Sequence, residues 1–241
     1  MLSVEEVQLN GRLPQRRQAI VEPIRELNKI RIVDNGEPLV DLRRHCPELL
    51  FTEEPDPFGQ PRLFYLRESV ADMLNRAKQI LPSGHTFMLW STYRTLDYQR
   101  TIYQRFMEEL QKQHPDWPKN ILRRQTNRFV HPPDIKTPPG HMTGGAVDLI
   151  IVGPDGKPLD MTSPYGPERK DARPVAATLA EGINLQARKN RALLVAVMGE
   201  VGFTNYAGEW WHWSYGDSCW AWRLERDVAI YGPAPWPTAI R

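Results

Sequence analysis

The stretch HMTGGAVDLIIV (141–152) contains the feature that does most to decide the fold. Its last part, AVDLIIV (146–152), is apolar except for one aspartate, and a short apolar run of this kind predicts a buried strand. An isolated carboxylate in such a strand is energetically costly, so Asp148 must be paired or bound to a metal. The strand therefore predicts both a part of the core and the position of a site.

The spacing between His141 and Asp148 restricts how both could bind one metal ion. Zinc requires its ligand atoms about 2 Å away. A straight strand would separate the two residues by about 23 Å, and a helix by about 10 Å. Only a chain that bends back brings them together, and Gly144 and Gly145 permit such a bend because glycine accepts a positive φ. In the alternative interpretation, His141 is a surface loop residue and Asp148 stabilises a turn.

The segment GEWWHWSYG (208–216) offers a third ligand, His212. Two histidines and one aspartate leave the fourth tetrahedral position of zinc to water, which is the pattern of a catalytic site. Glu209 is then the candidate general base that takes a proton from that water. The tryptophans at 210 and 211 would exclude solvent. The alternative is a core strand in which Glu209 caps a helix or pairs with an arginine.

Arg94, in WSTYRTLDYQR (90–100), follows an apolar strand at the point where a helix begins. An arginine at this position can stabilise negative charge that develops on an oxyanion. It can equally be a helix-start arginine that pairs with an acid. The sequence by itself leaves both interpretations open.

The composition excludes several classes of protein. The 31 basic and 29 acidic residues give a formal charge of +2, so neither nucleic acid nor a membrane surface is an expected partner. The N-terminus has no apolar signal-like region, and no run reaches the length of a membrane span. Cys46 and Cys219 have no metal or redox spacing and are expected to be free thiols. We therefore expect a cytoplasmic protein.

Apolar periodicity predicts helices at 66–81, 96–113, 118–129 and 184–203, and strands at 86–93 and 146–152. Segments 30–42, 209–215 and 221–231 are expected to be extended, and residues 131–145 are too rich in proline and glycine for regular structure. Helices and strands do not alternate in a repeating βα rhythm, which favours an α+β fold.

Three motifs, TYR (92–94), HMTGGAVD (141–148) and EWWH (209–212), occur in the order found in the VanX-like zinc D-alanyl-D-alanine dipeptidases. Each motif alone is weakly specific, but the three together, at near-family spacings, are strongly specific. The resemblance covers roughly residues 64–216 and includes Asp160-Met161. It implies the hedgehog-like fold of this superfamily of zinc peptidases, a small antiparallel sheet with flanking helices.

The resemblance also implies a role for each matching residue. His141, Asp148 and His212 match the ligands of one zinc ion per chain, Glu209 matches the catalytic base, and Arg94 matches the arginine that steadies the tetrahedral intermediate. The implied reaction is attack of zinc-activated water on the carbonyl of a small dipeptide. Further residues are expected to contact the substrate: Tyr93, Ser163, Tyr165, Glu168 and Trp211.

Three positions depart from the family pattern. Pro139 stands where a serine commonly precedes the first ligand, and Thr95 stands where proline commonly follows the arginine. Gly166 aligns with an aspartate that pairs with the substrate amino group, and Glu168 is a substitute two residues later. The catalytic set is thus retained while the recognition set is altered, so the sequence predicts dipeptide hydrolysis more firmly than specificity for D-Ala-D-Ala.

We expect a single catalytic domain over 1–241, with an N-terminal extension (1–60), a core that carries the motifs (64–216) and a C-terminal strand and tail (217–241). The leading hypothesis is a zinc dipeptidase that acts on a D-Ala-D-Ala-like dipeptide. The alternatives are a related zinc peptidase that cuts peptidoglycan stem peptides and a non-catalytic zinc-binding domain of the same fold. Retention of Glu209 and Arg94 favours an enzyme, because a structural zinc site needs neither.

Overall fold

The computed structural model describes residues 13–21, 23–162 and 173–236. A five-stranded sheet with strand order β3-β5-β6-β8-β7 lies at its centre. The strands are β3 (Leu50–Phe51), β5 (Thr86–Ser91), β6 (Ala146–Val152), β8 (His212–Ser214) and β7 (Thr204–Asn205). Neighbouring strands are antiparallel except β3 and β5, which are parallel. The predicted α+β class is confirmed, and the sheet is mixed at one edge rather than wholly antiparallel.

Strand β6 is the middle of this sheet, with β5 on one side and β8 on the other. All seven of its residues are buried, including Asp148. The sequence predicted these limits and this burial, because an apolar strand without alternation has both faces covered. The central strand therefore carries a charged group into the interior of the protein.

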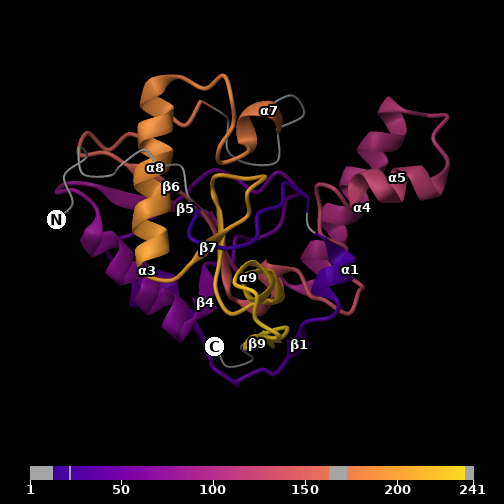
Figure 1. Ribbon diagram of the computed structural model, residues 1–241, viewed down its shortest axis with the longest axis horizontal. Coiled ribbons are helices and arrows are strands. Elements are labelled where there is room, and N and C mark those ends of the chain that lie inside the picture. Colours follow the sequence, from indigo (N-terminus) through magenta and orange to yellow (C-terminus); the bar gives the residue numbers. More distant parts are fainter. Residues whose placement is uncertain (1–12, 22, 163–172, 237–241) are drawn as a thin grey trace.

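Helices α3 (Glu68–Ile80) and α8 (Leu185–Glu200) pack on each other and lie together on one side of the molecule (Figure 1). Their buried faces join the sheet in one hydrophobic core, which includes Leu74, Val197 and Ile151. Helices α4 (Leu96–Gln113) and α5 (Lys119–Thr126) pack on each other and project from the opposite side (Figure 1). The four long helices therefore match the four predicted helices.

Two small sheets join the beginning of the chain to later segments. Strand β1 (Arg31–Ile32) is parallel to β9 (Val228–Ala229), and β2 (Leu39–Asp41) is antiparallel to β4 (Tyr65–Arg67). The described part of the chain also contains five short helices: α1 (Ile24–Leu27), α2 (Leu42–His45), α6 (Gly140–Thr143), α7 (Arg173–Ala176) and α9 (Ser218–Arg223). Strand β1 thus lies against β9, which follows it by almost 200 residues in the sequence.

Two predicted segments differ from the structure. Residues 131–145 were expected to lack regular structure, yet they contain α6, a single turn that begins after Pro139 and ends at the left-handed Gly144. Residues 221–231 were expected to be extended, but helix α9 occupies their first part. The side chain of Asp217 caps this helix by accepting a hydrogen bond from the backbone N–H of Trp220. The C-terminal strand and tail therefore include a helix as well as β9.

The EWWHWSY segment is also only partly extended. Glu209, Trp210 and Trp211 form a turn, and strand β8 begins at His212. Cys46 and Cys219 are both buried and form no disulfide, as expected. Among the residues that the structure describes, none of the helices has the length and apolar character needed to span a bilayer. The cytoplasmic location stays a prediction.

Candidate metal centre

The register of the sheet places three polar side chains in a row. Asp148 on β6 lies opposite His212 on β8 and opposite Ser91 on β5. The last pairing depends on a β-bulge, because Leu89 pairs with Leu149 and the strand then shifts by one residue at Trp90. Directly opposed residues in a sheet project from the same face. The sheet therefore presents a serine, an aspartate and a histidine side by side.

Helix α6 brings His141 to the same place through a tight bend. Gly144 has φ 72° and ends the helix in the left-handed conformation. Gly145 has no positive φ, but a Cβ there would lie 2.3 Å from the carbonyl oxygen of Tyr215. Gly144 is therefore needed for its left-handed backbone conformation, and Gly145 for its close packing against Tyr215. This refines the prediction that both glycines supply a positive φ.

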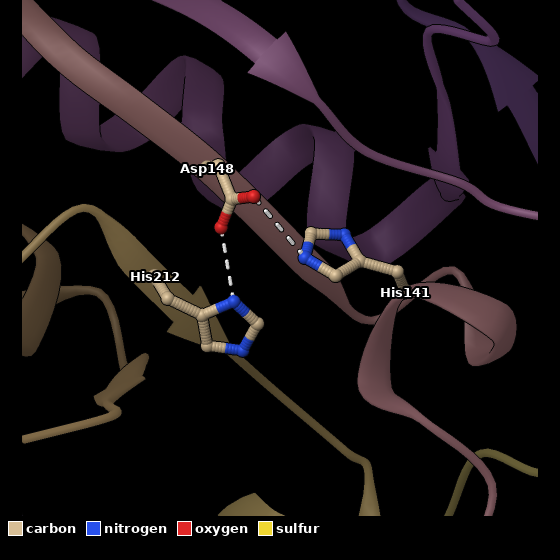
Figure 2. A group of neighbouring side chains, drawn as sticks. All are labelled: His141, Asp148 and His212. Atoms are coloured by element: carbon tan, nitrogen blue, oxygen red, sulfur yellow. Dashed lines mark hydrogen bonds and ion pairs between the residues drawn. The ribbon is translucent and has the colours of Figure 1, made fainter. Parts of the chain in front are cut away.

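The three predicted ligands converge as a compact group (Figure 2). His212 Nδ1 lies 2.9 Å from Asp148 Oδ1, and His141 Nε2 lies 3.4 Å from Asp148 Oδ2. One ligand atom from each residue lies within 4.8 Å of the other two. Figure 2 shows one imidazole directed at each carboxylate oxygen, with the three side chains coming from α6, β6 and β8. The structure thus brings together residues separated by up to 71 positions in the sequence.

A backbone carbonyl fixes the orientation of the His141 ring. The Nδ1–H of His141 donates a 2.7 Å hydrogen bond to the carbonyl oxygen of Thr92. The backbone N–H of Arg94 in turn donates to the carbonyl of His141 over 3.1 Å. Because Nδ1 of the neutral ring carries the proton, Nε2 keeps the lone pair with which it can bind a metal.

The environment gives two of the three side chains, His141 and Asp148, the protonation state that a metal requires. Burial, together with the charge of Arg94, lowers the pKa of His141 to about 4, so this imidazole is neutral at pH 7. Burial alone would raise the pKa of Asp148, but the adjacent imidazoles hold it well below its usual range. Burial opposes the charged form of His212, yet its hydrogen bond to Asp148 and the charges of Asp148 and Glu209 raise its pKa.

Arg94 lies at the edge of this group. Its Nη2 is 3.3 Å from Asp148 Oδ2, and its Nε and Nη2 both donate to Ser91 Oγ, over 3.0 and 2.8 Å. The side chain retains one fifth of its exposure, so the guanidinium lies between the buried carboxylate and solvent. The predicted oxyanion stabiliser is thus held beside the ligand group by a serine hydroxyl.

The turn between β7 and β8 carries Glu209 to the same edge of the sheet. Its backbone N–H donates to the carbonyl of Tyr206, and its carbonyl accepts from the N–H of His212. Its side chain is half-buried, and its charge acts on His212. The compact ligand group contains only His141, Asp148 and His212 among the described residues.

The expected substrate contacts have different environments. Trp211 is fully buried and meets Trp210 edge to face, so in this structure its indole belongs to the core. Tyr93 is also buried, and its hydroxyl donates to the carbonyl of Ala234. Ser163, Tyr165 and Glu168, together with Gly166, lie outside the described residues. The contacts with substrate stay predictions.

Sequence reasoning missed Ser91 and Thr92 as members of the site. Both lie in WSTYR, directly before Arg94, but serine and threonine in a strand carry no functional signal of their own. Their roles depend on the bulge at Trp90 and on the approach of α6, which no local pattern reveals.

A family model and a curated protein are each similar to most of this chain. A family model described as D-ala-D-ala dipeptidase matches residues 51–228. A D-alanyl-D-alanine dipeptidase from Synechocystis sp. is 27% identical over 243 residues, which cover 87% of this chain and 97% of that protein.

Two solved structures are also similar to parts of the chain. The LdcB LD-carboxypeptidase has a TM-score of 0.42 at 22% identity, over 76% of this chain and 71% of its own. The vancomycin-resistance D,D-pentapeptidase VanY, in complex with Zn(II), has a TM-score of 0.40 at 17% identity, over 69% of this chain and 85% of its own. The family match spans most of the chain and all three motifs, and the chain therefore belongs to the D-ala-D-ala dipeptidase family of metallopeptidases.

Proposed function

We propose that this protein is a zinc dipeptidase that hydrolyses dipeptides of the D-Ala-D-Ala type. The observation that carries the proposal is the convergence of His141 Nε2 and His212 Nδ1 on the two oxygens of Asp148, with the Arg94 guanidinium beside them. A buried carboxylate shared by two imidazoles and an arginine is a costly arrangement for stability alone. A metal that these groups hold for catalysis explains why they lie together.

The donor set fits zinc. Two imidazole nitrogens and one carboxylate are the ligands of many catalytic zinc sites, and they leave one coordination position open. The hydrogen bond from His141 Nδ1 to the Thr92 carbonyl is the outer contact that zinc-binding histidines normally make. When bound, zinc supplies a Lewis acid that activates water and polarises the peptide carbonyl.

Glu209 and Arg94 divide the remaining chemistry. Glu209 accepts a proton from the attacking water and returns it to the nitrogen of the leaving amine. Arg94 is aimed by Ser91 and offers its N–H groups to the negative charge that develops on the carbonyl oxygen. Trp210 and Trp211, which follow Glu209 in the same turn, are fully buried and keep water out of the core behind it.

The substrate class rests on the family and on the curated relative. That relative is named a D-alanyl-D-alanine dipeptidase, and its match covers nearly its whole length. A small dipeptide is therefore the expected substrate. Pro139 and Gly166 depart from the family pattern at positions that concern recognition, so the side chains accepted by the site need a direct measurement.

A panel of D,D-, L,D- and L,L-dipeptides, with released amino acids as the readout, tests the proposal. We expect D-Ala-D-Ala to be cleaved with the highest kcat/KM. Glu209→Gln should lower kcat at least about a hundredfold, because general acid–base catalysis contributes roughly 10²–10⁴-fold. Cleavage of the L,L series as good as that of D-Ala-D-Ala would overturn the substrate, and near-normal activity of Glu209→Gln would overturn the base.

A further inference from the structure

Asn205 is a buried polar residue directly behind the turn that carries Glu209 and His212. It is the last residue of β7, pairs with Trp213 on β8 and has no exposed surface. A buried amide is costly unless its donors and acceptor are all engaged. Its contacts therefore indicate what the residue does.

Both donors of the Asn205 amide are directed at the turn. The Nδ2 group donates 3.0 Å hydrogen bonds to the backbone carbonyls of Glu209 and of His212. These two carbonyls belong to the proposed base and the proposed third ligand. One side chain thus links the two residues whose relative position the reaction requires.

The orientation of the amide is fixed from its other side. Asn205 Oδ1 accepts a 2.5 Å hydrogen bond from the hydroxyl of Thr178, which is itself buried. The backbone N–H of Thr178 donates to the carbonyl of Ala207, inside the same turn. If the amide were rotated by half a turn, its oxygen would face the carbonyl oxygens of Glu209 and His212, and no hydrogen bond could form between these acceptors.

Two further groups hold this assembly in place. The side chain of Gln15 forms hydrogen bonds with both the N–H and the carbonyl of Asn205 and so occupies the open edge of β7. Arg191 on α8 donates to the carbonyls of Ala177 and Val175, and Ala176 between them accepts from the N–H of Trp210. The turn is therefore tied to a rigid helix and to the sheet.

We propose that Asn205 is a positioning residue, which holds the backbone of Glu209 and His212 so that the base and the third zinc ligand keep their relative geometry. The inference rests on the proposed function, since it assigns Asn205 to the machinery of that site. Outer groups that orient metal ligands typically contribute 10–100-fold to metal affinity or activity. A shift of about 1 Å in a catalytic group costs about a hundredfold in rate.

Two substitutions separate positioning from general stability. Asn205→Ala removes all the side-chain hydrogen bonds, whereas Asn205→Asp keeps the volume and the acceptor for Thr178 but replaces both donors. Thr126→Val is a matched control in α5, because it removes a buried hydroxyl that donates to the carbonyl of Leu122, outside the described site.

The measurements are kcat and KM for the preferred dipeptide, the zinc Kd of the apoprotein in competition with a chromophoric chelator, and the Tm. For both Asn205 variants we expect kcat to fall about ten- to a hundredfold and the zinc Kd to rise about tenfold, with KM changed less than about threefold. The Thr126→Val control should remain within about threefold in kcat and zinc Kd. If Asn205→Ala fails to fold, Asn205→Asp alone tests whether Asn205 positions Glu209 and His212.

Two results would overturn the role of Asn205. One is a wild-type zinc Kd and kcat in Asn205→Asp, and the other is an equal loss in Thr126→Val at the same decrease in Tm. If the wild-type protein hydrolyses none of the dipeptides, the proposed function fails. The comparison of zinc Kd values then still decides whether Asn205 positions His212.

Discussion

Asp148 is the residue on which the site depends. It is 5% exposed on the central strand, and each of its oxygens faces an imidazole. A carboxylate in this position keeps its charge only because cations and N–H groups surround it. This residue was predictable from the sequence, because an aspartate within the buried strand AVDLIIV must be paired with other polar groups or bound to a metal.

The residues that aim the reactive groups were not predictable in the same way. His141, His212, Glu209 and Arg94 belong to motifs whose residue types indicate their chemistry. Ser91 acts only because the bulge at Trp90 brings it opposite Asp148. A one-residue shift of register moves a strand side chain to the other face, and no local pattern reports such a shift.

Arg94→Lys should lower kcat by about 10²–10³-fold, which is the usual cost of losing one donor to a developing oxyanion. Lysine keeps the charge but lacks the planar fork that donates through both Nε and Nη2 to Ser91. Steady-state kinetics with the preferred dipeptide measures this loss. A kcat within threefold of wild type would mean that Arg94 does not stabilise the transition state.

Ser91→Ala is the companion substitution. It leaves the guanidinium in place and removes only the hydroxyl that aims it, so the fall in kcat should be smaller, about tenfold. An equal loss in both variants would indicate that Ser91 has a role beyond orienting Arg94.

At the scale of the element, helix α6 is only one turn long but positions one of the three proposed metal ligands. It carries His141, and Gly144 ends it with φ 72°. The sequence predicted the bend but not the helical turn before it, because four residues between prolines and glycines show no periodicity. The longer helices were predictable because their apolar residues recur over many turns.

Helix α9 is a second element that the local sequence pattern did not predict, because the pattern there favoured an extended chain. Segment 221–231 was expected to be extended, yet its first residues, 221–223, form the end of helix α9. The cap by Asp217 and the burial of Trp220 and Ala221 in a cluster with Ile30 and Ala229 determine the helix instead. Packing with residues distant in the sequence overrides the preference of the segment.

Gly144→Ala should destabilise the protein and weaken zinc binding. A left-handed alanine costs about 1–2 kcal/mol, and a Cβ at this position would lie 2.4 Å from Leu39 Cδ2. Gly156→Ala is a matched control, because Gly156 has φ 76° but open space around its Cα. Urea unfolding and zinc titration of both variants separate backbone strain from the clash. Equal effects of the two substitutions on zinc affinity would contradict a specific role for the α6 bend.

At the scale of the whole molecule, Arg67 joins four segments that lie far apart in the sequence. Its guanidinium is 2% exposed and donates to the Thr143 carbonyl, to Asp34 and to the Gly232 carbonyl. Its backbone N–H donates to the carbonyl of Gly144. The loop before β2, the end of α6 and the segment after β9 therefore meet on one side chain. Sequence patterns could not predict this junction, because it consists of long-range contacts alone.

Arg67→Met should lower the free energy of unfolding by about 3 kcal/mol, because it leaves buried carbonyls without donors. Asp34 retains a third of its exposure, so water can solvate it after the change. Arg226→Met removes an exposed guanidinium that lies over the Trp220 ring and should cost less than about 1 kcal/mol. Urea denaturation of both variants measures the difference, and an equal effect would contradict the importance of the junction.

The metal content of the purified protein tests the central claim most directly. Protein prepared without chelators should contain about one zinc per chain, and Asp148→Ala and His212→Ala should each lose most of it. Glu209→Gln should retain the full zinc content, because Glu209 acts on water and not as a ligand. Wild-type protein without zinc, or full zinc content in His212→Ala, would contradict the assignment of His141, Asp148 and His212 as the metal centre.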